Sequence, residues 1–302
     1  MISAGAFFLG KRFTVPVFCG IIMERENTMN YTHQAIKYVL RNIVYIIPLV
    51  LLPAMFLSFS LDRVAINAVV ETALSGNLQA WTFAQVFRTV SIFNFGSWRI
   101  VLFGFLGVVL LVVCVAMLMA LLEKHMRIGK RSLSGVLNKL NDNLLSTFWY
   151  TLLLLGIYEF WSLITAALLF FASRIDSVIL AYAFSGGVVV AMHVVLLYWI
   201  SLIYLWLPCM QITGFRATEA LYYSNQLSSP VKWKILIGQL FVLLFSETII
   251  CACSLLANGA PIFYACTMAL YVVMIAVYCV RMQIAYFHLD HIERADLRRY
   301  YR

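Results

Sequence analysis

The sequence predicts an all-α membrane protein: a polytopic bundle of six transmembrane helices with short amphipathic helices at the membrane interface. Hydrophobic residues make up 63% of the 302-residue chain and charged residues only 12%, whereas soluble domains are about half apolar and about a quarter charged. The mean hydropathy is +0.91. Apolar runs near the length of about 20 residues that spans a bilayer recur along the chain, which excludes a soluble domain with one anchor.

Three regions are predicted. Residues 1–28 hold short apolar patches interrupted by charged residues, so we expect a poorly ordered leader rather than a signal peptide. Residues 29–286 form the six-span membrane domain, and residues 287–302 form a helical cytoplasmic tail of mixed charge. Tyr300 and Tyr301, which lie beside arginines, make this tail a possible docking site for a partner protein.

Each predicted span is an apolar run bounded by polar or charged residues. Pro48 and Pro53 are expected to kink the first span, and Pro261 suits the first turn of the last. The spans are 43–61, 100–122, 147–171, 178–207, 235–256 and 262–280.

The basic residues predict the orientation. With a cytoplasmic N-terminus, all 22 Lys and Arg residues lie inside except Arg63, Arg88, Arg99 and Arg174, which is a strong positive-inside bias. We therefore expect a multi-pass protein of the cytoplasmic membrane with both termini inside. The net charge of +9 is then explained by anionic lipid head groups on the cytoplasmic side, without nucleic acid.

The outer segment 62–99 is expected to contain an amphipathic helix on the membrane surface. Polar residues recur every four positions at Arg63, Asn67 and Glu71. The opposite face is apolar. This helix is either a lid packed on the bundle or an element that gates a substrate. The apolar positions are Val64, Ile66, Val69, Val70 and Ala73.

A weak internal repeat is visible on the predicted cytoplasmic side. The segments THQAIKYVLRN, SLSGVLNKLND and TEALYYSNQLS each precede an outward-going span, and similar turns at Gly129 and Gly214 introduce the second and third. The repeating unit is then an interfacial helix, a span out and a span back. Such repeats would be parallel rather than inverted.

The chain also resembles a known group of bacterial membrane proteins. The opening QAIKYVLRNIVYIIPLVLLP and the motif GFRATEALYYSNQL before a span are similar to the YciC-like inner-membrane proteins and to the membrane domain that accompanies some glycerophosphodiester phosphodiesterases. The resemblance covers roughly Met29 to Tyr286. It implies a cytoplasmic-membrane protein with no established catalytic residues, and the soluble phosphodiesterase domain is absent.

Three ionisable residues fall near the middle of predicted spans: Glu159 in the third, His193 in the fourth and Glu247 in the fifth. A charged group at the bilayer centre costs between about 3 and more than ~10 kcal/mol, so these side chains are expected to face the bundle interior. In a structural interpretation, neutral carboxylic acids donate hydrogen bonds across helices. In a functional one, the three residues share a polar cavity that carries protons or binds a cationic substrate.

No catalytic or cofactor motif supports an enzyme. HExxH, GxSxG and GxGxxG do not occur, and the seven cysteines form no CxxC pair. We therefore predict a non-enzymatic protein without a cofactor, transport-related or membrane-accessory, that acts through an intramembrane polar cavity. The alternative is a scaffold or partner subunit of a membrane complex, in which the buried polar residues only hold helices together.

Overall fold

The computed structural model describes residues 31–130, 136–256 and 259–298, and within these ranges the chain forms helices and short 3-10 turns without any strand. The predicted all-α bundle is thus confirmed. The predicted leader, residues 1–28, and the tyrosines at 300 and 301 lie outside the described residues.

All six predicted spans are helical. Five helices are long and apolar enough to cross a membrane alone, and α3 is the sixth when it is joined to the preceding helix α2 (Tyr31–Arg41). With 17 residues, α3 is about 25 Å long, near the lower limit for a span. The six are α3 (Ile43–Phe59), α6 (Trp98–Ile128), α7 (Val136–Ala172), α8 (Val178–Ile203), α11 (Lys232–Leu256) and α12 (Ala260–Leu289).

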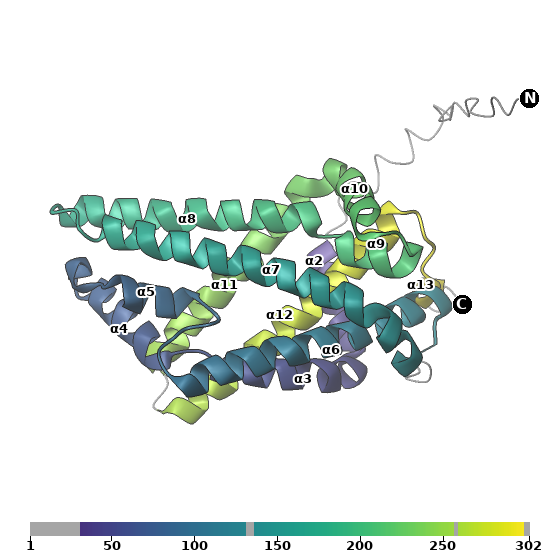
Figure 1. The fold of residues 1–302 in the computed structure, drawn as a ribbon, viewed down its shortest axis with the longest axis horizontal. Helices are drawn as coiled ribbons and strands as arrows, with labels where there is room; N and C mark the ends of the chain where they lie inside the picture. Colours follow the sequence, from purple (N-terminus) through teal and green to yellow (C-terminus); the bar gives the residue numbers. More distant parts are fainter. Residues whose placement is uncertain (1–30, 131–135, 257–258, 299–302) are drawn as a thin grey trace, which may run out of the picture. The chain divides into compact units, whose positions relative to one another are not determined.

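The span helices form two packed hairpins with a crossing pair between them. Helix α3 packs against α6, and α7 packs against α8 (Figure 1). Of the crossing pair, α12 contacts both α3 and α6, whereas α11 contacts α8. The two crossing helices also contact each other. Helices α2 and α12 also meet, because the Tyr31 hydroxyl lies 3.0 Å from Nδ1 of His288. The start of α2 and the C-terminal part of α12 therefore lie at the same end of the bundle.

The predicted interfacial helices differ between the three segments. Helix α2 meets α3 at an angle of 100°, so it turns away from the span as expected. The third segment is α10 (Ala217–Ser228), which follows α9 (Trp206–Thr213) and continues through η3 (Ser229–Val231) into α11. The described part of the second segment is not a separate helix, since α7 is continuous from Val136.

The two introductory turns are alike in structure. Gly129 ends α6 with φ 77° and Gly214 ends α9 with φ 70°. This left-handed conformation favours glycine because a β-carbon would clash there. The similarity noticed in the sequence therefore reflects two equivalent helix ends.

The outer segment packs against the bundle. It consists of α4 (Arg63–Leu74), η2 (Leu78–Ala80) and α5 (Phe83–Val90). Helix α5 contacts α7 and α4 contacts α11, and Figure 1 shows both short helices between those two long ones. The predicted apolar face is partly wrong: Ile66 is buried, but Val64 is 79% exposed.

The predicted helical tail is helical only in part. Helix α12 ends at Leu289, where His291 takes a positive φ of 53°, and a single turn, α13 (Ala295–Arg298), follows. Arg294 pairs with Asp296 at 2.8 Å, and the Tyr223 and Tyr286 hydroxyls both donate to Asp290. The bond from Tyr223 of α10 holds the chain at the end of α12 against the bundle, whereas the other two contacts are local to this part of the chain.

Candidate functional site

His193 and Glu247 form a direct pair between α8 and α11. Nε2 of His193 lies 2.9 Å from Oε1 of Glu247, and Nδ1 lies 2.7 Å from the carbonyl oxygen of Val189. The ring of Trp161 meets the imidazole edge-on, with centroids 5.1 Å apart. His193 is almost fully buried, whereas the Glu247 side chain is 37% exposed.

The hydrogen bonds of this pair fix how many protons it holds. Nδ1 must donate to the Val189 carbonyl, because a carbonyl only accepts. One further proton then lies between Nε2 and the carboxylate, either on the histidine of an ion pair or on a neutral glutamic acid. Both forms have zero net charge, which explains how the pair is accommodated among apolar helices.

Glu159 lies in a different cluster and accepts hydrogen bonds from the outer segment. Its carboxylate accepts from Ser91 Oγ at 2.7 Å, from the backbone N–H of Ile92 at 2.9 Å and from that of Phe93 at 3.3 Å. The neighbouring Tyr158 hydroxyl donates to the Val90 carbonyl at 2.7 Å. An acceptor surrounded by donors is a carboxylate rather than the hydrogen-bond-donating acid of the structural interpretation.

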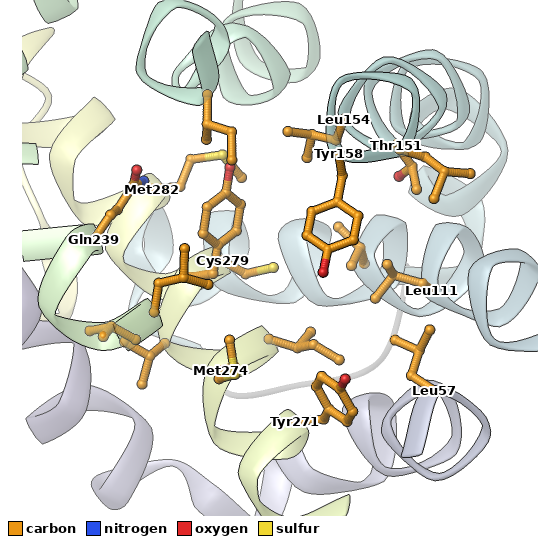
Figure 2. Close-up of a pocket in the computed structure, with 18 of the residues that line it drawn as sticks. Leu57, Leu111, Thr151, Leu154, Tyr158, Gln239, Tyr271, Met274, Cys279 and Met282 are labelled. Carbon is orange, nitrogen blue, oxygen red and sulfur yellow. The ribbon is translucent and has the colours of Figure 1, made fainter. Parts of the chain in front are cut away.

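A cavity of about 340 Å³ lies between α3, α6, α7, α8, α11 and α12. Nearly all of its wall is apolar, with side chains such as Leu57, Leu111, Leu154 and Met274 arranged around the space in Figure 2. Glu159, His193 and Glu247 are not among its lining residues. The structure therefore pairs two of the predicted site residues, separates the third, and places the cavity beside them.

Glu159 acts on this cavity through its neighbour. Ile92, whose backbone N–H donates to Glu159, is one of the residues that line the wall. The carboxylate thus positions a residue of the outer segment against the cavity without contacting the space itself.

Two polar residues contribute to the opposite end of the wall, although almost none of the surface that faces the space is polar. Arg281 of α12 lines it and is only 5% exposed. Its Nε donates to the Tyr204 hydroxyl at 2.9 Å, and Nη1 donates to Thr32 Oγ1 at 3.3 Å. Gln239 of α11, also 5% exposed, lies at the same end.

Sequence reasoning missed these two polar residues. Arg281 directly follows the predicted sixth span, so it was counted among the cytoplasmic arginines that face lipid head groups. The signal was the apolar sequence MQIAYF directly after it. That run indicates that the helix continues and that Arg281 is inside the packed bundle.

Comparison with known proteins identifies no relative: no family model, curated protein or solved structure matches the chain. The resemblance to the YciC-like proteins stays a prediction.

Proposed function

We propose that this chain is a non-enzymatic, multi-pass protein of the cytoplasmic membrane that binds an amphipathic molecule between its helices, as a transport-related or membrane-accessory protein. The observation that carries the proposal is the apolar cavity of about 340 Å³, with the polar residues Arg281 and Gln239 among those that line it. Ligand pockets are typically about 300–1,000 Å³, mostly apolar, with a few polar groups that orient the ligand.

The geometry favours this function over the polar route first expected. Glu159 and the His193–Glu247 pair already satisfy their hydrogen bonds within the protein. A proton or cation path needs groups that can exchange partners along a wet cavity, whereas the cavity wall is apolar.

The scaffold alternative is supported by one specific observation. The Glu159 carboxylate is engaged by three donors from residues 91–93, so this half-buried side chain holds the outer segment to α7. A scaffold, however, does not need an internal cavity of this size, because helical cores are normally filled to crystal-like density.

Filling the cavity tests the proposal. Leu154→Trp on α7 places a large side chain in the space, whereas Leu153→Trp, at a position 39% exposed, is the matched control. Native mass spectrometry of the full-length chain, released from neutral detergent, would measure binding of added stearic acid and of methyl stearate. We expect the wild type and Leu153→Trp to bind at least one probe in a one-to-one complex, and Leu154→Trp to bind neither.

Failure of the wild type to bind either probe contradicts the proposal. Equal binding by the two tryptophan variants contradicts it too, since it places the probe on the outer surface. Size-exclusion profiles of both variants control for folding.

A further inference from the structure

We propose that the bound molecule carries a negatively charged head group, a carboxylate or a phosphate ester, on a single hydrocarbon chain, and that Arg281 binds this head group. The inference rests on the proposed function and specifies the chemistry of the same cavity. It assigns a binding role to a residue that the sequence placed among the surface arginines.

Arg281 lacks the partner that a buried cation needs. Of the five guanidinium N–H groups, the bonds to Tyr204 and Thr32 use two, and both acceptors are neutral hydroxyls. No carboxylate among the described residues forms an ion pair with it. A buried unpaired charge costs several kcal/mol, and in membrane proteins such residues mark ligand paths.

A second polar group at this end also lacks its partners. Both amide atoms of Gln239 are buried without a hydrogen bond of normal geometry, although the side chain lies near the Tyr204 hydroxyl that receives the Arg281 bond. Buried amides are nearly always hydrogen-bonded, so an orphaned one requires an explanation. An oxyanion would accept from the Gln239 amide and from the guanidinium together.

The backbone leaves room for these groups to meet. Gly238 of α11 faces Arg281 and Thr32, and a β-carbon at this position would lie 3.2 Å from Thr32 Oγ1 and 3.6 Å from Nη1. Glycine therefore permits the close approach of α11 to the Thr32 hydroxyl, which accepts from Arg281, and a β-carbon would be in ordinary contact with the guanidinium.

The rest of the cavity fits one hydrocarbon chain. Along α12 the lining runs from Tyr271 to Arg281, a rise of about 15 Å at 1.5 Å per residue. The volume of about 340 Å³ is at the lower end of the range for ligand pockets. These dimensions favour a single-chain amphiphile over a two-chain lipid.

Paired probes test the charge of the head group. Stearic acid and methyl stearate share a chain and differ in charge when the acid is ionised. We expect the wild type to prefer the acid and Arg281→Gln to lose that preference by about ten- to a hundredfold, because a hydrogen bond to a charged group contributes about 1.5–3 kcal/mol. Arg281→Lys should keep part of it. Binding would be measured by native mass spectrometry of the full-length chain in neutral detergent.

A second variant guards against loss of folding. Gln239→Glu supplies a carboxylate beside Arg281, so it should compete with the head group, abolish acid binding and preserve ester binding, while the new ion pair supports the fold. Lysophosphatidic acid distinguishes the two head groups: tighter binding than stearic acid assigns a phosphate ester, and weaker binding assigns a carboxylate.

The outcomes separate the two proposals. If neither probe binds the wild type, the proposed function fails. If both bind equally, or if Arg281→Gln weakens acid and ester alike, the cavity remains a binding site and the role of Arg281 is refuted.

Discussion

Two polar groups in the predicted spans are held by hydrogen-bonding partners from distant parts of the chain. Glu159 binds backbone amides that lie 66 and 67 residues earlier in the sequence, and His193 binds Glu247 54 residues later. Hydrocarbon offers neither donor nor acceptor, so each group must find its partner within the protein. The cluster at Arg281 differs, because the Gln239 amide is among the buried polar groups of the described residues that have no such partner, and we propose the ligand there.

Replacing Glu159 tests its structural role. Glu159→Gln keeps one acceptor but directs an NH₂ group at the donors of residues 91–93. We expect a loss of about 1–3 kcal/mol in unfolding free energy, the cost of an unsatisfied buried group. Glu71→Gln is the matched control because Glu71 is exposed on α4 and accepts only from Asn67.

The measurement is detergent-titration unfolding of both variants and the wild type. Equal stability of the two variants would show that the contacts of Glu159 with the outer segment contribute nothing to the fold.

At the scale of the helices, glycines set how closely two elements approach. A β-carbon at Gly107 of α6 would lie 3.0 Å from Leu57 Cδ2 and 3.1 Å from the Leu57 backbone nitrogen. The backbone nitrogen cannot move aside independently of α3. Small residues allow this kind of close backbone packing in membranes, where dispersion contacts replace the hydrophobic effect.

Two glycine substitutions compare a packed helix face with an open one. Gly107→Ala should lower the thermal unfolding temperature, because the new methyl group forces α3 and α6 apart. Gly156→Ala on α7, where a β-carbon meets nothing within 4 Å, should be neutral or stabilise by about 1 kcal/mol or less through helix propensity. If Gly107→Ala raised the thermal unfolding temperature, the close approach of α3 and α6 would be contradicted.

At the scale of the whole described bundle, the outer segment and the short helices of the later part of the chain lie at opposite ends. Helices α4 and α5 are at one end, and α9, α10 and α13 at the other (Figure 1). The second end holds an ion-pair cluster in which Glu123 binds Lys139 at 2.6 Å and Arg127 at 3.0 Å. The positive-inside bias predicts that this basic end faces the cytoplasm.

Reporter fusions test that orientation. Alkaline phosphatase, which is active only outside the cytoplasm, should be active when fused after Gly76, in the turn that follows α4, and inactive at the C-terminus. A cytoplasmic fluorescent reporter should give the opposite pattern. Phosphatase activity at the C-terminal site would show that the bundle has the opposite orientation in the membrane.

The apolar composition of the sequence was enough to predict a hydrocarbon environment for the spans, and therefore their helical backbone. Six apolar runs can satisfy their backbone hydrogen bonds in hydrocarbon only as helices, and the structure forms each of them. The helix ends at Gly129 and Gly214 and the first interfacial helix were also readable, because capping and amphipathicity are local properties.

Only the tertiary structure decided which polar groups meet and where space remains. The sequence placed Glu159, His193 and Glu247 at one depth in the predicted spans. Depth does not determine how each helix is rotated about its axis or which helix packs beside it, so the sequence could not separate Glu159 from the other two. It also could not distinguish Arg281 from a surface arginine, since that difference arises from α2 and α11 packing on α12 and from the Tyr204 hydroxyl that follows α8. A cavity forms where packed helices leave space between them, and no local sequence pattern predicts it.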